Sequence, residues 1–220
     1  MKIAYVNPNA TAAMTDAMVA VAAQVLPAAQ IIGLTNHDGP PAIQGAADGE
    51  AALPGVLARI AQAEADGADA VVIGCFDDTG LAEAQGMTSL PVLGIGQSSY
   101  VMAAVLGRRF AVMTSLPISI PVIEGNINSG GYAPNCAGVL ASDLPVLTID
   151  EGSEETRAHL AACINQAARD TKAGAVILGC AGMAPLRQDL TARTGVVLID
   201  GVAASATLAQ AAVSYLSSAR

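Results

Sequence analysis

The segment ADAVVIGC, residues 68–75, recurs 105 positions later as AGAVILGC, residues 173–180. Each copy is a short aliphatic run that ends in Gly-Cys, a pattern typical of a buried strand in a parallel sheet. The match continues downstream, where residues 92–96 correspond to residues 197–201. An offset of about half the chain indicates duplication of a whole lobe, because solenoid repeats are roughly 20 to 50 residues long.

Short apolar runs alternate along the chain with longer Ala-rich segments, which predicts an α/β fold with parallel sheets flanked by helices. The repeat predicts two pseudo-symmetric lobes with a crevice between them. The apolar runs predict eight strands, at residues 3–6, 31–34, 70–73, 92–95, 110–113, 146–149, 175–178 and 196–199. The Ala-rich segments predict helices at residues 11–26, 50–66, 98–106, 154–171 and 202–216.

The repeat also suggests where the lobes divide. We expect the first lobe over residues 1–97 and the second over residues 98–201. The final helix, about residues 202–220, has an apolar composition that would let it pack back on the first lobe.

Composition narrows the class of protein. The chain carries 10 Lys and Arg against 19 Asp and Glu, a net charge of −9 that disfavours nucleic acid and acidic membrane surfaces as partners. A hydrophobic content of 53% excludes disorder, yet no apolar run reaches the ~18 residues needed to cross a bilayer. With no continuous apolar core of a signal peptide and only four cysteines, we expect a cytoplasmic protein.

Cys75 and Cys180 each follow a predicted buried strand and a glycine. This places both at the carboxyl ends of parallel strands, where open α/β sheets form ligand crevices. Because they occupy matching positions of the repeat, we expect them to face each other. Helix N-termini expected near Thr79 and Met183 would favour the thiolate form. The alternative for either cysteine alone is a buried small hydrophobe at a strand end.

The chain is poor in groups that anchor cofactors. His37 and His159 do not have the spacing of metal ligands, and neither Lys2 nor Lys172 is placed to form a Schiff base. There is no GxxxxGK, and Gly94–Gly96 lacks the third glycine of a dinucleotide fingerprint. We therefore predict no metal and no cofactor.

Two opposed thiols suit acid–base catalysis on both faces of a carbon acid. One thiolate removes a proton, and the other thiol delivers a proton from behind. This arrangement predicts racemisation. Cys136, in a Pro-Asn-Cys loop, and Cys163, within an amphipathic helix, lack this context and are expected to be structural.

Polar residues follow the first strand of each lobe. Asn7 and Asn9 follow one, and Thr114 and Ser115 follow the other. We expect these groups to face the crevice and to hold the carbonyl oxygens of a substrate as its enolate forms. An equally open role for Asn9 is the N-cap of the helix that starts near Thr11.

Two further segments are expected at the crevice. The Gly/Pro-rich stretch 38–45 is interpreted as a lid or rim, with Pro40 and Ile43 as contacts, although flexible linkers look similar. The residues that follow the thiols are also expected to contact substrate: Phe76, Asp77, Ala181 and Gly182. Carboxylates beside Cys75 would raise its pKa or cap a helix, and capping is the role expected of Asp78.

These features resemble the aspartate/glutamate/hydantoin racemase superfamily, most closely its hydantoin and allantoin racemase branch. The resemblance implies two pseudo-symmetric α/β lobes, a homo-oligomer, and cofactor-independent two-base racemisation of a small molecule by Cys75 and Cys180. The matching pieces are NPN at 7–9, GPPAIQG at 39–45, GCFDDTGL at 74–81, RFAVMTSLP at 109–117, GCAGMA at 179–184 and IDGVAA at 199–204.

Some positions depart from the family patterns. The branch usually has Pro at the position of Thr79 and Glu at the position of Gln97. At the two cysteines, glutamate racemases look like they carry Cys-Asn-Thr and Cys-Thr-His. This chain instead has Cys-Phe-Asp at 75–77 and Cys-Ala-Gly at 180–182. A hydantoin or allantoin substrate is therefore expected, with an aspartate/glutamate-type racemase as one alternative. The other alternative is a non-catalytic two-lobed binding protein, which has no need of two thiols.

Overall fold

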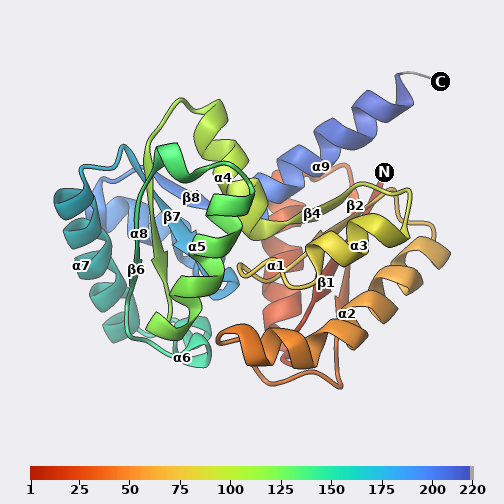
Figure 1. Cartoon of the computed structure of the whole chain (residues 1–220), viewed down its shortest axis with the longest axis horizontal. Helices are drawn as coiled ribbons and strands as arrows, with labels where there is room; N and C mark the ends of the chain where they lie inside the picture. The colour runs from red at the N-terminus through yellow and green to blue at the C-terminus, as the bar shows by residue number, and fades with distance from the viewer. Residues whose placement is uncertain (219–220) are drawn as a thin grey trace.

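The computed structural model describes residues 1–218, which form two lobes, each built on a four-stranded parallel sheet (Figure 1). The strand orders are β2-β1-β3-β4 and β6-β5-β7-β8, so both lobes share one topology. This confirms the predicted α/β fold with two pseudo-symmetric lobes. The strands are β1 (Lys2–Asn7), β2 (Gln30–Thr35), β3 (Ala70–Ile73), β4 (Val92–Gly94), β5 (Phe110–Thr114), β6 (Cys136–Ala141), β7 (Ala175–Gly179) and β8 (Leu198–Asp200).

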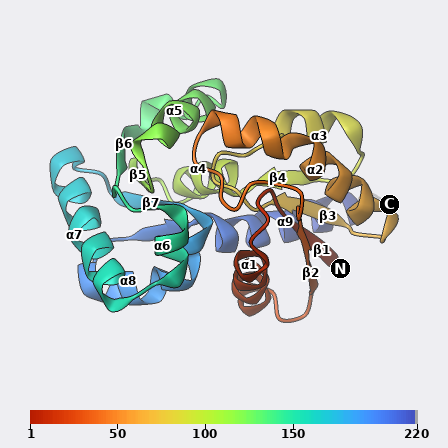
Figure 2. The same ribbon diagram turned by 90° about the horizontal axis from the view of Figure 1, so that it is seen from below.

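Helices cover both faces of each sheet, as the view turned by 90° shows (Figure 2). The first lobe carries α1 (Ala12–Val25), α2 (Ala46–Ala65) and α3 (Leu81–Met87). The second carries α5 (Ile120–Ser129), α6 (Val146–Glu151), α7 (Glu154–Thr171), α8 (Arg187–Thr194) and the 3₁₀ helices η1 (Pro117–Ser119), η2 (Ala133–Asn135) and η3 (Ala181–Leu186). Between the sheets lie α4 (Ile95–Val105) and α9 (Gly201–Ser217).

Alternation along the strands explains why both faces of each sheet are covered. In β1, Ile3 and Tyr5 pack into the cluster at the junction of the lobes, whereas Ala4 and Val6 pack under α2. Successive side chains of a strand point to opposite faces, so a strand that is apolar on both faces needs a helix on each.

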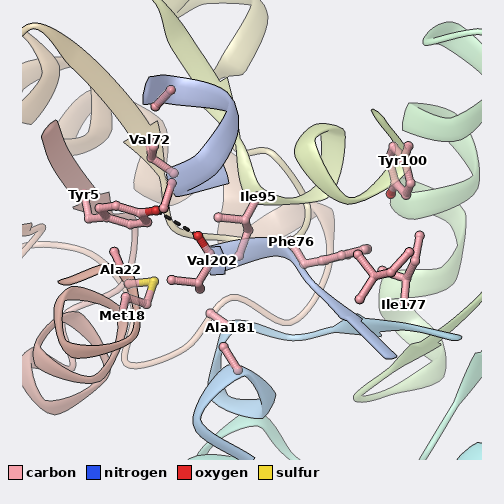
Figure 3. Close-up of a cluster of buried hydrophobic side chains, with 14 of the residues drawn as sticks. Tyr5, Met18, Ala22, Val72, Phe76, Ile95, Tyr100, Ile177, Ala181 and Val202 are labelled. Carbon is pink, nitrogen blue, oxygen red and sulfur yellow. Dashed lines mark hydrogen bonds between the residues drawn. The ribbon is translucent and has the colours of Figure 1, made fainter. Parts of the chain in front are cut away.

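The lobes share a continuous apolar junction (Figure 3). The hydroxyl of Tyr5 in β1 donates to the backbone oxygen of Val202 in α9 at 2.9 Å and shares a 3.0 Å hydrogen bond with Ser205. A Cβ at Gly201 would overlap the backbone oxygen of Ile95, so the start of α9 approaches α4 closely only because residue 201 is glycine. The junction between the lobes is therefore closely packed.

The strand predicted at residues 146–149 is wrong, because these residues form α6. Pro145, with φ of −59°, precedes the helix, and the buried residues Val146 and Ile149 have helical i, i+3 spacing. The strand that completes the second sheet is β6. Its residues are all only partly buried, and Gly138 has φ of 152° beside a register shift, so this edge strand has a weak sequence signal.

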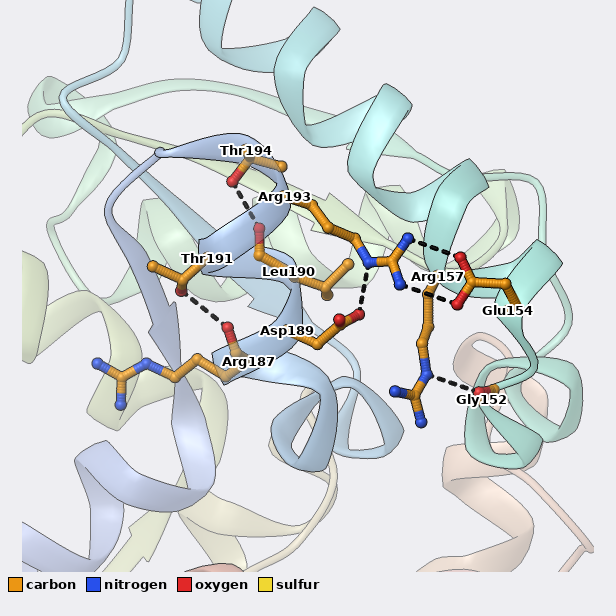
Figure 4. A network of polar contacts seen from close by, with 9 residues as sticks. All are labelled: Gly152, Glu154, Arg157, Arg187, Asp189, Leu190, Thr191, Arg193 and Thr194. Atoms are coloured by element: carbon orange, nitrogen blue, oxygen red, sulfur yellow. Dashed lines mark hydrogen bonds and ion pairs between the residues drawn. The ribbon is translucent and has the colours of Figure 1, made fainter.

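The five predicted helices are confirmed to within a few residues, although the last two positions of the final one lie outside the described residues. At the outer end of the second lobe, Arg193 of α8 forms ion pairs with Glu154 of α7 at 2.8 Å and with Asp189 at 2.7 Å (Figure 4). These ion pairs are solvent-exposed, so each contributes little to stability. The pair with Glu154 links α8 to α7. Within residues 1–218, no helix has the length and apolarity of a membrane span.

Candidate active site

A cavity lies between the lobes where β1, β3, β5 and β7 end, with a volume of about 30 Å³. That is space for only a water molecule or two. Its lining comes from both lobes: Asn9, Met14, Ile43, Gly74, Cys75, Phe76, Asp77, Thr114, Ser115, Ser119, Val146, Gly179, Cys180 and Ala181.

Cys75 and Cys180 are free thiols in the walls of this one cavity. The glycine before each lets its strand end pack closely. A Cβ at Gly74 would meet the sulfur of Met18 and, at Gly179, would lie 2.8 Å from Val112. The Gly-Cys pattern is therefore a packing requirement that delivers one thiol from each lobe.

The two thiols are held in the protonated form. Burial raises the pKa of Cys180 to about 12 and that of Cys75 well above its ordinary value. The carboxylate of Asp77 raises the pKa of both thiols further. Backbone amides of Gly182 and Met183 lower the pKa of Cys180, but by less than burial raises it.

The expectation that helix N-termini favour the thiolates is therefore wrong. After Cys75, Gly80 adopts a left-handed conformation with φ of 76° before α3 begins, and Cys180 is followed by the 3₁₀ helix η3 instead of an α-helix. Desolvation of a charged sulfur outweighs the few backbone amides that these turns supply.

Asn9, after β1, lines the cavity, whereas Asn7, the last residue of β1, is buried and lies outside the lining. The Asn7 side-chain amide donates to Asn9 Oδ1 at 2.9 Å and to Thr15 at 3.0 Å. Asn9 Oδ1 also accepts from the backbone amide of Thr11 just before α1 at 2.9 Å. Asn9 is therefore not the N-cap of α1, which is Thr11; its side chain holds the turn before the helix, and Asn7 orients it.

The second lobe supplies hydroxyl groups to the opposite wall. Thr114 and Ser115 line the cavity as expected, and the Thr114 hydroxyl donates to the backbone oxygen of Gly179 at 3.2 Å. Ser119 of η1 also lines it and is almost fully buried. The sequence did not predict that Ser119, Met14 and Val146 line the cavity. The one indication was Pro117, which predicts a turn just before Ser119.

The segment predicted as a lid or rim closes one side of the cavity. Ile43 lines it, whereas Pro40 lies outside the lining and accepts a backbone hydrogen bond from Ala10 at 2.9 Å. The next residue, Gln44, accepts a hydrogen bond from the Val146 amide at 3.1 Å, which ties the segment to the second lobe. Ile43 and Val146 both line the cavity, one from each lobe, beside this hydrogen bond.

Asp78 caps a helix, but it caps α4 and not the helix that follows it. Its two carboxylate oxygens accept hydrogen bonds from the amides of Gly96 at 2.9 Å and Gln97 at 2.7 Å. Burial raises its pKa to about 7, although these amides counteract the rise. Asp78 is therefore occupied in anchoring the junction.

Asp77, by contrast, lies in the cavity wall. Burial raises its pKa to about 7, and the Gly45 amide facing the carboxylate lowers it. The oxygen Oδ2 is buried and has no hydrogen-bond partner.

Of the remaining residues expected to contact substrate, two line the cavity and one does not. Phe76 and Ala181 line the cavity, and the ring of Phe76 meets Tyr100 edge-on with centroids 5.9 Å apart. Gly182 lies outside the lining and faces the backbone of Asp150 in α6. Among residues 1–218, no three His, Cys, Asp or Glu side chains gather in a way that would hold a metal ion.

This cavity combines two thiols, an amide, hydroxyls and one carboxylate, a set suited to moving a proton at carbon beside a carbonyl. The family model described as Asp/Glu/Hydantoin racemase matches residues 3–209. The chain belongs to this racemase family. It is 42% identical over 212 residues to a hydantoin racemase of Rhizobium meliloti, which covers 96% of this chain and 88% of the relative. A hydantoin racemase of Pseudomonas sp. (strain NS671) is 35% identical over 214 residues, covering 97% and 86%.

Solved racemase structures have the same architecture. The allantoin racemase from Klebsiella pneumoniae superposes with a TM-score of 0.93 at 33% identity, covering 98% of this chain and 88% of that one. The allantoin racemase from Pseudomonas fluorescens gives 0.92 at 32% identity, covering 98% and 92%. Glutamate racemase from Bacillus anthracis, at 17% identity and a TM-score of 0.72, shares the fold. The named relatives are isomerases.

Proposed function

We propose that this chain is a cofactor-independent racemase that exchanges a proton at a carbon beside a carbonyl, with Cys75 and Cys180 as opposed acid and base. The observation that carries the proposal is the placement of both thiols, one from each lobe at repeat-equivalent positions, in one cavity. Whole-length similarity to hydantoin and allantoin racemases supports hydantoins or allantoin as the substrate class.

Both thiols are protonated at rest, so the reaction balances once one of them has given its proton to solvent. For one enantiomer, the Cys75 thiolate takes the proton from carbon, and the Cys180 thiol gives its proton to the opposite face. For the other enantiomer the roles reverse. Each turnover leaves the protein with the two protonation states exchanged, so the reverse reaction restores the first state.

The enolate that forms between the two proton transfers needs hydrogen-bond donors near its oxygen. The side-chain amide of Asn9 and the hydroxyls of Ser115 and Ser119 line the cavity where such an oxygen would lie. In a water-excluded site, such preorganised donors stabilise developing charge more strongly than they would in water.

Substrate entry requires the cover to open. The cavity volume of about 30 Å³ is far smaller than a five-membered ureide ring. The hydrogen bond from the Val146 amide to Gln44 is one contact between the lobes that would break on opening. The same closure then excludes water from the enolate.

The decisive experiment measures exchange of the carbon-bound proton in D₂O, by NMR, for each enantiomer of several 5-substituted hydantoins, allantoin, aspartate and glutamate. We expect Cys75→Ser and Cys180→Ser to retain exchange from opposite enantiomers, because a serine hydroxyl donates a proton but is too weak a base. Cys163→Ser, with its sulfur outside the cavity lining, is the matched control and should exchange like the wild type.

Two outcomes would contradict the proposal. Equal loss of exchange from both enantiomers in both variants would show that the thiols do not divide the work. Retained ligand binding with no exchange in the wild type would identify a two-lobed binding protein instead.

A further inference from the structure

The carboxylate of Asp77 lies in the cavity wall, and one of its oxygens has no partner within the protein. The backbone oxygen of Asp77 accepts a hydrogen bond from the side chain of Asn126 in α5 at 2.9 Å, which pins the residue across the junction. The Gly45 amide faces the carboxylate, while Oδ2 is buried without a partner. A buried acceptor without a donor costs free energy, so the site is incomplete until a ligand supplies one.

Asp77 lines the same cavity of about 30 Å³ as both thiols. Its charge raises the pKa of Cys75, two residues away, and also that of Cys180 in the opposite lobe. A carbon that reacts with both sulfurs lies between them. Because Asp77 lines the same small cavity, its carboxyl is within reach of the atoms bonded to that carbon.

This carboxylate breaks the symmetry of the lobes. The repeat offset of 105 residues relates Asp77 to Gly182. Gly182 has no side chain and lies outside the cavity lining, so that side of the cavity has no carboxylate at the matching position. Within the described lining, the cavity therefore has a carboxylate beside Cys75 and none beside Cys180.

The charged groups of the cavity lining, within the described residues, are of one sign. The lining includes Asp77 and, among residues 1–218, neither Lys, Arg nor His. A substrate carboxylate would enter without a cationic partner and beside a like charge, both of which are costly in a site of low dielectric.

We propose that Asp77 accepts a hydrogen bond from an N–H group bonded to the reacting carbon, and that it selects uncharged ureides over substrates with a free carboxylate. This rests on the proposed racemase function and deepens it. In a hydantoin the acceptor pairs with N1–H, which adjoins the reacting C5, whereas N3–H lies across the ring. The ammonium of an amino acid would also suit Asp77, but its carboxylates have no counter-charge in the lining.

The test compares 5-methylhydantoin with its N1-methyl and N3-methyl derivatives at about pH 8, where a carboxyl of pKa about 7 is ionised. Both kcat/KM for C5 exchange and calorimetric affinity are measured. In the wild type, N1-methylation should cost roughly 10- to 100-fold, the range for a hydrogen bond to a charged group, and N3-methylation much less. Equal costs of the two methylations would overturn the proposal without any variant.

Asp77→Asn separates hydrogen bonding from crowding, because the side chain keeps its size. We expect the loss caused by N1-methylation to become roughly tenfold smaller in this variant. It should stay unchanged in Asp38→Asn, which alters an exposed carboxylate in the segment 38–45. A second pair of ligands, hydantoin-5-acetate and its isosteric acetamide, tests charge. The wild type should prefer the amide, and Asp77→Asn should reduce that preference.

The outcomes distinguish the two proposals. If hydantoins bind with this N1 pattern but exchange no proton, the assignment of Asp77 stands and the racemase function fails. If proton exchange occurs and Asp77→Asn leaves the N1-methyl cost unchanged, the function stands and Asp77 has no such role.

Discussion

The protonated resting state of the thiols leads to a quantitative expectation for their reactivity. With a pKa of about 12, Cys180 is a thiolate in only ~10⁻⁴ of molecules at pH 8, against about a quarter for an ordinary cysteine. A more basic thiolate is more nucleophilic, by about fortyfold over this pKa difference. The net expectation is alkylation of Cys180 about fiftyfold slower than that of an unperturbed thiol, before any slowing by the cavity cover.

The assay is iodoacetamide alkylation of the native protein, with each cysteine followed separately by peptide mass spectrometry. Because the thiolate fraction rises with pH, the rate at Cys180 should climb about tenfold per unit between roughly pH 7 and 10 without reaching a plateau. A plateau below about pH 9 would refute the reasoning, since it would show that backbone amides outweigh burial.

Removing the Asp77 charge sharpens this prediction. Asp77 raises the pKa of both cavity thiols, so Asp77→Asn should lower both pKa values and speed alkylation at Cys75 and Cys180 together. Cys163, whose pKa is raised by its own burial and by Asp143, should react at the wild-type rate. A faster reaction at all three cysteines would indicate general loosening of the fold instead.

Three further predictions concern stability and cofactors. Tyr5→Phe removes the bonds to Val202 and Ser205 and should lower the free energy of unfolding in urea by about 1 to 2 kcal/mol. Asp78→Ala leaves two amides at the start of α4 without an acceptor and should cost about 2 kcal/mol or more in the same assay, so an unchanged urea midpoint would contradict the capping role. Proton exchange should survive exhaustive dialysis against a chelator, and its loss would contradict cofactor independence.

The fold was largely predictable because its signal lies in the repeat. Matching Gly-Cys strand ends 105 residues apart indicate duplication, and parallel strands with apolar residues on both faces require helices on both sides. The sequence predicted a strand where α6 lies and did not predict β6, for a physical reason. A four-residue apolar run fits a strand or one face of a short helix, and only the packing against β7 and η3 decides between them.

The candidate site was predictable to the level of strand ends and not beyond. Because residues after neighbouring strands share one edge of a sheet, Asn9, Cys75, Thr114 and Cys180 fall at one cavity. Ser119 and Val146 arrive through loops whose course the sequence does not specify. The pKa of the thiols was predicted with the wrong sign, because depth of burial depends on how tightly two lobes close and not on the local Gly-Cys pattern.

The two lobes match in topology but differ in the groups beside their thiols, and this difference limits what the asymmetry can do. Phe76 and Asp77 follow one cysteine, whereas Ala181 and Gly182 follow the other. Enantiomers have equal free energies, so the equilibrium constant between them is 1 and kcat/KM must be equal in the two directions however unlike the thiols are. A higher kcat for one enantiomer must therefore be matched by a proportionally higher KM. The asymmetric carboxylate can orient the ring and exclude anionic substrates, but it cannot favour one product at equilibrium.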